Sequence, residues 1–188
     1  TFKDGLEIIE KECDRLTTMV EELLDFSKFV SGKITIKKEK VNIRDLINDI
    51  KFQLLHRAER ENIAFEVVYP ENMPIIISDE NRLKQVFINI LDNAFKFTPN
   101  GGRIAFGTEY DGKEIVFRIS DTGCGISPEE LPRVKEKFYK GRNSNSQNGI
   151  GLSICDEIIK LMEGNLYIKS RIGKGTEVIV TLPVIREG

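Results

Sequence analysis

Apolar side chains recur along the first 31 residues in alternating steps of four and three. The positions are Phe2, Leu6, Ile9, Cys13, Leu16, Val20, Leu23 and Val30, with the polar Ser27 as a gap. This spacing is typical of a helix that packs along another helix, and Ser31-Gly32 is a typical helix end. We therefore predict a long, coiled-coil-like helix over residues 1–31. Its partner would come from an upstream segment, from another subunit or from both; packing onto its own domain is the alternative.

After residue 31 the pattern changes to mixed helix and strand periods, which predicts a second unit over residues 32–188. Helices are predicted at 42–60, with Asn42 as N-cap, at 80–97 and at 149–162, with a short helix near 128–135. Strands are predicted at 34–36, 63–69, 75–77, 103–109, 114–120, 166–170 and 176–182, with a hairpin turn at Asp111-Gly112. The predicted fold class is α+β, a two-layer sandwich with a mixed, mostly antiparallel sheet covered on one face by three helices.

Two of the predicted helices have a continuous apolar face, which we expect in the core. In the 42–60 helix this face consists of Ile43, Leu46, Ile47, Ile50, Leu54 and Leu55. In the 80–97 helix it consists of Leu83, Val86, Phe87, Ile90, Leu91, Ala94 and Phe97.

The 80–97 helix also has a polar flank that contains Asn89, Asn93 and Lys96. A solvated surface is the ordinary interpretation of such a flank. Asn is a poor helix former, however, so two of them one turn apart indicate a role. Mg²⁺ prefers oxygen ligands and keeps waters and phosphate oxygens in its shell. Asn93 is therefore a candidate metal ligand, with Asn89 beside it and with Lys96 placed to contact a phosphate.

A second cluster, Asp121-Thr-Gly123-Cys124-Gly125-Ile126, follows directly after an apolar strand. Asp and Gly are ordinary turn residues, so a plain turn is one interpretation. In the functional interpretation, the Asp121 carboxylate accepts a hydrogen bond from the amino group of adenine. Guanine presents an acceptor at that position, so the same carboxylate would reject GTP. The two glycines would let the backbone pass close to the ring, and Cys124 would line the pocket rather than act as a nucleophile.

A third cluster, Gly149-Ile150-Gly151-Leu152, stands where a polar loop turns into a helix. A helix N-terminus binds anions through its free N–H groups, and glycine permits a close approach. The loop over 141–148 could close over a triphosphate, and Lys137, Lys140 and Arg142 could add positive charge. The single histidine, His56, lies within a predicted helix, and we interpret it as structural rather than as a phosphate acceptor.

Composition narrows the partners. The formal net charge is −2, so nothing in the bulk composition favours nucleic acid as a partner. No apolar run reaches the roughly 20 residues of a membrane-spanning helix. Three cysteines without close pairs favour a reducing, cytoplasmic setting. The chain starts without Met and without a signal-peptide pattern, as expected for a piece of a longer protein.

The three clusters, in this order, resemble the ATP-binding domain of sensor histidine kinases, which belongs to the GHKL superfamily shared with type II topoisomerase and chaperone ATPases. The likeness covers nearly the whole chain. Residues 89–98 resemble the N box of the family, 121–125 its first glycine box, 137–140 its F box, 149–154 its second glycine box and 173–183 its closing box. Residues 1–31 resemble the second helix of the dimerisation hairpin, ending in Glu22-Leu-Leu-Asp-Phe-Ser27.

The resemblance implies a Bergerat-type fold, ATP and Mg²⁺ as ligands, transfer of the γ-phosphate to a histidine, and relay to an aspartate of a response regulator. It also implies a homodimer through residues 1–31, a cytoplasmic domain, and leaves open a membrane anchor elsewhere in the parent protein. Asn89, Asn93 and Lys96 would be catalytic, with Asn93 on the metal. The implied nucleotide site consists of Asn89, Asn93, Lys96, Phe97, Asp121, Gly123, Gly125, Ile126, Phe138, Tyr139, Lys140, Gly149, Ile150, Gly151, Leu152 and Thr176.

The chain departs from the family pattern at three points. The first hairpin helix, with the histidine that such kinases phosphorylate, is absent, so this fragment should bind ATP without completing its own reaction. Gln147 stands where the second glycine box normally has one more Gly. Lys135 stands where the F box usually has a first aromatic residue.

Three alternatives remain open from the sequence. A topoisomerase- or chaperone-type ATPase would carry a Glu at position 89 to activate water, and Asn cannot serve as that base. A serine kinase of the anti-sigma type would not carry the heptad helix. A catalytically silent module that binds nucleotide and dimerises is the third alternative, and Gln147 is the residue that favours it.

Overall fold

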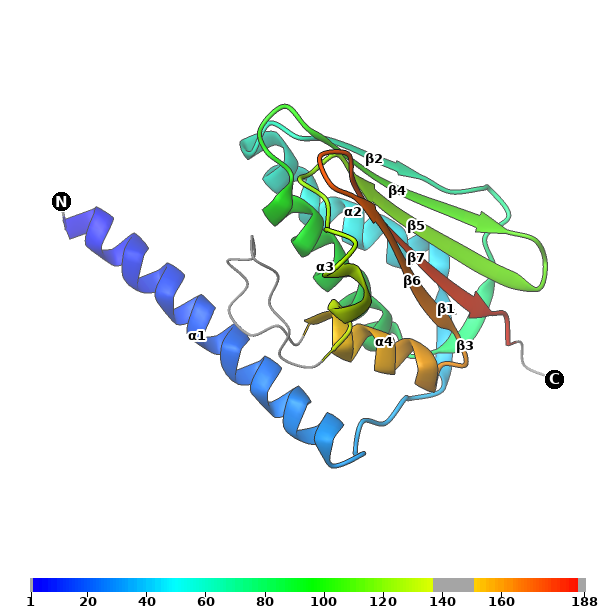
Figure 1. Cartoon of the computed structure of the whole chain (residues 1–188). Coiled ribbons are helices and arrows are strands. Elements are labelled where there is room, and N and C mark those ends of the chain that lie inside the picture. Colours follow the sequence, from blue (N-terminus) through cyan, green and yellow to red (C-terminus); the bar gives the residue numbers. More distant parts are fainter. Residues whose placement is uncertain (1, 137–150, 186–188) are drawn as a thin grey trace.

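The structure is a computed structural model that describes residues 2–136 and 151–185, apart from the side chain of Thr18. A long N-terminal helix extends from a compact α+β body (Figure 1). The helices are α1 (Phe2–Val30), α2 (Ile43–Arg60), α3 (Glu80–Phe97) and α4 (Gly151–Leu161), with a 3₁₀ turn η1 (Leu131–Arg133). The strands are β1 (Glu39–Asn42), β2 (Ala64–Val68), β3 (Ile75–Ser78), β4 (Arg103–Tyr110), β5 (Glu114–Asp121), β6 (Asn165–Arg171) and β7 (Gly175–Pro183).

The body is a two-layer sandwich. Its five-stranded sheet has the order β2-β4-β5-β7-β6, and β1 and β3 form a separate antiparallel pair. Only the β2–β4 pair of the large sheet is parallel, and the other pairs are antiparallel. Helices α2, α3 and α4 pack together on the sheet (Figure 1). The predicted fold class, a mixed and mostly antiparallel sheet covered by three helices, is confirmed.

The core forms where the apolar faces of the helices meet the sheet. Phe87 of α3 is fully buried between Phe106 of β4 and Phe117 of β5, with ring centroids 5.4 and 4.5 Å away. Aromatic rings at such distances gain stabilisation beyond their buried area. Packing at this point fixes α3, which carries the predicted Asn and Lys residues, against the strand that ends at Asp121.

Side-chain caps fix the first residues of helices α2 and α3. The predicted N-cap Asn42 accepts a hydrogen bond from Asp45 N, 3.3 Å away. Asp79 caps α3 by accepting from Arg82 N at 3.1 Å. A cap of this kind is worth about 1 kcal/mol and fixes the residue at which the helix begins.

Four sequence expectations are wrong. No strand covers 34–36, because Ile34 enters the core without a ladder and the strand forms at 39–42 against β3. The short helix near 128–135 is only the 3₁₀ turn η1. Leu55 is 37% exposed because it lies beside the buried face of α2. Phe97 borders a cleft instead of the core, while Phe95 is buried against Phe65, with ring centroids 5.7 Å apart.

The apolar stripe of α1 is not covered by the body. Most of its members are more than half exposed, from Leu6 at 51% to Phe2 at 86%. In the last turns of α1, Phe26 and Phe29 pack against the core. Packing of the whole stripe onto its own domain is therefore excluded for this structure. Within the described residues, no helix combines the length and the apolar character needed to cross a bilayer.

Candidate functional site

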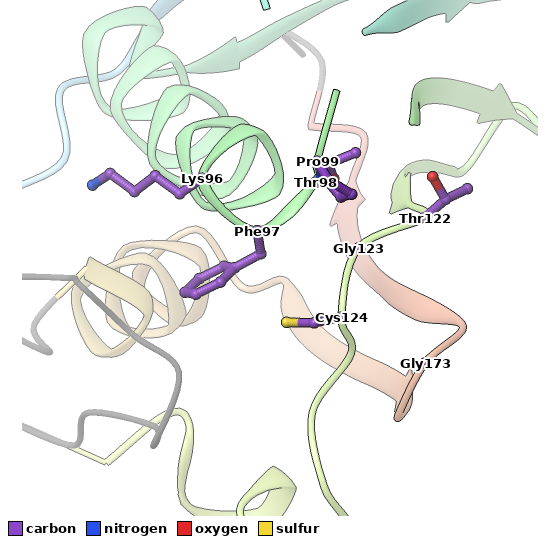
Figure 2. A pocket seen from close by; sticks show the side chains of 8 residues that line it. All are labelled: Lys96, Phe97, Thr98, Pro99, Thr122, Gly123, Cys124 and Gly173. Atoms are coloured by element: carbon purple, nitrogen blue, oxygen red, sulfur yellow. The ribbon is translucent and has the colours of Figure 1, made fainter. Parts of the chain in front are cut away.

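A cleft of about 460 Å³ opens where the end of α3 meets the turn after β5 (Figure 2). It is a shallow, open site rather than an enclosed cavity, and two of its lining residues are glycines. Its lining residues are Lys96, Phe97, Thr98, Pro99, Thr122, Gly123, Cys124 and Gly173. The structure thus brings three predicted site residues, Lys96, Phe97 and Gly123, to one cleft, and it confirms Cys124 as a lining residue.

Gly123 allows the two walls of this cleft to approach each other. A Cβ at this position would lie 2.5 Å from the carbonyl oxygen of Phe97, which is closer than real side chains come to backbone. The same carbonyl accepts a hydrogen bond from Cys124 N at 3.4 Å. Gly123 therefore has a structural role, because it lets the turn lie directly against the C-terminus of α3.

Gly125 and Gly175 do the same on the other side of the turn. Gly125 has a φ of +72°, and a Cβ there would lie 2.2 Å from the carbonyl oxygen of Arg171. Gly175 has a φ of +116°, and a Cβ would lie 1.9 Å from the carbonyl oxygen of Asp121. Gly173 N donates to Cys124 O at 2.8 Å. The predicted first glycine box and closing box are thus one packed unit, although 50 residues separate them in sequence.

Asp121 is the last residue of β5, and its two carboxylate oxygens differ. Oδ1 accepts hydrogen bonds from Gly123 N at 2.8 Å and from Thr176 N at 3.3 Å. Within residues 2–136 and 151–185, no hydrogen bond reaches Oδ2. Burial raises the pKa of Asp121, and the two N–H donors only partly oppose that rise. One oxygen therefore holds the turn, while the other is open to a further donor.

Ser170 is a site residue that the sequence did not indicate. Its hydroxyl accepts from Ile126 N at 2.7 Å, donates to Gly175 O at 3.0 Å, and lies 2.8 Å from Thr176 Oγ1. It therefore fixes two of the predicted site residues, Ile126 and Thr176. The signal lies in the pairing of β6 with β7, where Ser170 is directly opposite Thr176. A single sequence does not give that register.

The two asparagines of α3 have different surroundings. The Asn89 side chain hydrogen-bonds to the thiol of Cys155 on α4, whose pKa is raised to about 12, because burial outweighs that hydrogen bond. Asn93 is partly buried, and no described residue forms a hydrogen bond with its side chain. An amide oxygen that no donor of the described residues occupies fits one position in a Mg²⁺ shell, whose other ligands are waters and phosphate oxygens.

Lys96 is engaged in an ion cluster. Its Nζ lies 2.8 Å from Asp92 Oδ2, and Asp92 Oδ1 lies 2.7 Å from a guanidinium nitrogen of Arg57 on α2. Burial disfavours both charges of the Asp92–Arg57 pair, but hydrogen bonds and attraction prevail. The pKa of Asp92 is therefore below its ordinary value and that of Arg57 above it.

The predicted phosphate end is only partly described. Gly151 and Leu152 form the first turn of α4, and no atom of the described residues lies within 4 Å of a Cβ built on Gly151. This leaves room for a ligand close to the helix N-terminus. The predicted site residues Phe138, Tyr139, Lys140, Gly149 and Ile150 lie outside the described residues, as do the departure at Gln147 and the polar loop over 141–148.

Lys135, which departs from the family pattern, has a clear structural role. Its Nζ donates to Asp156 Oδ1 on α4 at 3.1 Å and to the carbonyl oxygen of Leu166 at 2.8 Å. The Asp156 side chain is only 12% exposed. A charge-assisted bond therefore ties the segment before residue 137 to α4 and β6.

Other candidate sites find no support. In the described part of the chain, no group of three or more His, Cys, Asp or Glu side chains is placed to hold a metal ion. His56 is exposed on α2, on a segment separate from the cleft residues.

Comparisons with known proteins agree with this geometry. Residues 78–186 match the family model described as histidine kinase-, DNA gyrase B-, and HSP90-like ATPase. The sensor histidine kinase YclK of Bacillus subtilis is 34% identical over 182 residues, which are 94% of this chain and 38% of that protein. The chain thus spans well under half the length of this relative.

Two solved structures share the fold. Full-length ShkA, crystallised in complex with AMPPNP, has a TM-score of 0.81 at 26% identity, over 93% of this chain and 37% of that chain. ThkA, crystallised in complex with the response regulator TrrA, has a TM-score of 0.75 at 24% identity, over 98% of this chain and 52% of that chain. The chain belongs to the histidine kinase-, DNA gyrase B- and HSP90-like ATPase family, and it is a catalytic domain of the histidine kinase type.

Proposed function

We propose that this chain binds Mg·ATP and passes the γ-phosphoryl group to a histidine supplied by another segment of its parent protein. The phosphoryl group then moves to an aspartate of a response regulator. The observation that carries the proposal is Asp121. One of its oxygens is fixed by two backbone N–H groups, and no described residue forms a hydrogen bond with the other. Asp121 itself does not line the cleft, but Thr122 and Gly123, which follow it directly, do.

The open oxygen of Asp121 gives the site its choice of base. An ionised carboxylate accepts a hydrogen bond from the amino group of adenine. Guanine has a carbonyl oxygen at that position, which is also an acceptor and is therefore repelled by the carboxylate. Phe97 and Gly123 border the space for the ring, and the tight packing of Gly123 on α3 leaves no side chain in the way. ATP is therefore preferred over GTP.

The polar flank of α3 serves the phosphates. Asn93 would contribute an amide oxygen to Mg²⁺, with Asn89 held beside it by Cys155. Bound Mg²⁺ neutralises charge that develops on the transferring phosphoryl group. Lys96 contributes a positive charge to a phosphate, and the free N–H groups at the start of α4 provide a second anion site.

Transfer to a side chain suits this site better than hydrolysis. An ATPase of the related kind needs a carboxylate to activate water. The residue at that place is Asn89, which has no titratable carboxylate and is tied to the buried Cys155 thiol. Positioning an incoming histidine and neutralising charge then supply most of the catalysis.

The partners follow from the same proposal. The uncovered stripe of α1 needs a second helix, which we assign to the acceptor hairpin of a homodimer. ThkA, which shares the fold, was crystallised with a response regulator, and we propose a partner of that class here. ATP and response regulators place the domain in the cytoplasm, with any membrane anchor elsewhere in the parent protein.

A labelling experiment tests the transfer. The parent protein, with its acceptor hairpin, is incubated with Mg²⁺ and ATP labelled on the γ-phosphate. We expect a protein phosphate that survives base and is lost in acid, as a phosphohistidine is, and that Asp121→Asn strongly reduces. Lys84→Gln, on the far flank of α3, is the matched control and should label normally. Tight ATP binding without label would instead indicate a silent module. Release of free phosphate would indicate an ATPase, and an acid-stable label would indicate a serine kinase.

A further inference from the structure

In the ion cluster beside the predicted phosphate site, one carboxylate is shared by two cations. Asp92 bridges two cations, with Oδ2 on Lys96 at 2.8 Å and Oδ1 on Arg57 at 2.7 Å. Arg57 also bonds to Glu61 at 2.9 Å. Lys96, the residue expected to contact phosphate, is thus paired with a carboxylate of its own helix. Arg57 belongs to α2, which precedes the segment that matches the family model.

The pairing draws Lys96 away from the metal-ligand candidate. With about 3.6 residues per turn, Lys96 projects from α3 between Asn93 on one side and Asp92 on the other. Its Nζ lies on the Asp92 side. In Figure 2 the stem of Lys96 starts beside the cleft, and its amino group points away from Gly123 and Cys124. A phosphate held near Asn93 would therefore compete with Asp92 for the Lys96 ammonium.

Arg57 is fixed more firmly than Lys96. Its side chain is 24% exposed, against 46% for Lys96, and its guanidinium lies over the ring of Phe95 at 4.9 Å. A stacked, doubly paired guanidinium loses little freedom by staying in place. Arg57 therefore keeps Asp92 neutralised when Lys96 departs, and the exchange leaves no carboxylate without a counter-ion.

We propose that Asp92 is a positioning residue that holds Lys96 off the phosphate site until a nucleotide polyphosphate competes for it, with Arg57 as the permanent counter-ion. This inference rests on the proposed function of the site. Asp92 then weakens binding in proportion to the number of phosphates, and Arg57 reduces that effect. Substitutions of Asp92 and of Arg57 should therefore change ATP affinity in opposite directions, which distinguishes this role from a structural one.

Calorimetric titration of the chain with ATP, ADP and adenosine, each with Mg²⁺, tests the proposal. Asp92→Asn frees Lys96 and removes a negative charge, so ATP should bind about two- to fivefold more tightly, ADP less so, and adenosine equally well. Arg57→Gln leaves Asp92 to Lys96 alone, so ATP should bind about two- to fivefold more weakly. Arg57→Lys keeps the charge and should bind ATP almost as wild type does.

Two further variants separate the causes. Asp49→Asn breaks the other α2–α3 ion pair, Lys84–Asp49 at 3.2 Å, and serves as the matched control with unchanged affinities. In a Lys96→Met background, Asp92→Asn should lose most of its effect, because its target is gone. Thermal melting confirms that each variant is folded.

The results separate this inference from the proposed function. A wild-type chain that binds no ATP overturns the proposed function itself. A wild-type chain that binds ATP, with an Asp92→Asn variant that binds it more weakly, shows that Asp92 supports Lys96 in the bound state and overturns the inference. Equal changes for ATP and adenosine would show a merely structural role and would overturn it as well.

Discussion

We propose that Asp121 combines a structural and a recognition role in one carboxylate, and the two roles should respond differently to pH. Burial raises its pKa above the ordinary value of 3.8, and hydrogen bonds from Gly123 N and Thr176 N only partly oppose this. The ionised form is therefore costly in the folded protein. The stability contributed by this group is fully present below the unfolded pKa, and it is lost as pH rises through the folded pKa.

This predicts a trade between stability and binding. At neutral pH, Asp121→Asn should unfold at the same or a slightly higher temperature, because a buried charge is removed while Asn Oδ1 still accepts from Gly123 N. ATP affinity should fall, because the amide can present its N–H₂ to adenine. Differential scanning calorimetry and nucleotide titration measure the two effects. A variant that loses both stability and affinity would show that the charge mainly supports the turn.

In the wild type, ATP affinity should decline on acidification at a higher pH than an exposed aspartate would give. The carboxylate must be ionised to accept a hydrogen bond from the adenine amino group. Because its pKa is raised, ATP affinity should be lost at a higher pH. Titrations from neutral to mildly acid pH, with circular dichroism as a check on folding, should show this decline for wild type and not for Asp121→Asn. An identical pH profile for both proteins would contradict the role of Asp121.

At the residue scale, the sequence showed best those residues whose chemistry is local. Asp121 and the neighbouring glycines were recognisable because the turn that they form needs these residue types in these positions. Ser170 was not, because its role depends on lying opposite Thr176 across a strand pair. The pairing of Lys96 with Asp92 was also missed, since the same helical spacing allows contact with a ligand instead.

At the scale of elements, α1 joins α3 through Asp25, which bonds to two side chains of α3. Asp25 accepts from Arg82 at 3.3 Å and from Gln85 Nε2 at 2.6 Å, and the ion-paired side chains are only 20% and 18% exposed. Phe26 and Phe29 add apolar packing nearby. Long-range contacts of this kind position the helix end relative to the nucleotide site, because Arg82 and Gln85 lie on the helix that carries Asn89 and Asn93.

We expect Asp25→Ala to loosen the end of α1 without unfolding the body. The change leaves the partly buried Arg82 without its carboxylate, which should cost about 1–2 kcal/mol at the junction. Hydrogen exchange over residues 19–30 should quicken, while exchange in β4 and β5 should stay the same. Glu21→Ala, an exposed acidic position on the same helix, is the control. Unchanged exchange in Asp25→Ala would show that Phe26 and Phe29 hold the junction alone.

The elements that the sequence predicted well are those with a long period or an explicit cap. Helix α2 begins after Asn42 as expected, and the hairpin between β4 and β5 turns at Gly112, whose φ is +95°. The expected strand at 34–36 does not form, because Ile34 and Ile36 alternate with polar residues but have no neighbouring strand to pair with among the described residues. An alternating pair of apolar residues can predict which side chains turn toward the core, but a strand also requires a hydrogen-bonded partner strand from elsewhere in the fold.

For the whole molecule, the most conspicuous surface is the stripe of α1. Leu16 and Leu23 are 52% and 53% exposed, on a helix whose N-terminal part extends away from the α+β body in Figure 1. A single helix cannot bury such a stripe, and its heptad spacing fits a second helix. The body alone gives no reason for this spacing.

We therefore predict that the parent protein, with its upstream helix, is a dimer that Leu16→Glu with Leu23→Glu disrupts. Each charge would be placed in the apolar seam, which weakens association by several kcal/mol. Sedimentation equilibrium should show a shift from dimer to monomer. Phe52→Glu, at an apolar position of α2 that is 83% exposed, is the control and should remain dimeric. A dimer that survives the double substitution would place the interface elsewhere.

In the proposed function the site is an adenine-selective pocket, and nucleotide titration of this chain with ATP and with GTP, in the presence of Mg²⁺, tests this selectivity most directly. We predict a single ATP site, weaker binding of GTP, and a loss of this preference in Asp121→Asn. No binding heat with adenine nucleotides at millimolar concentration, or equal affinity for ATP and GTP in the wild type, would contradict the proposed function.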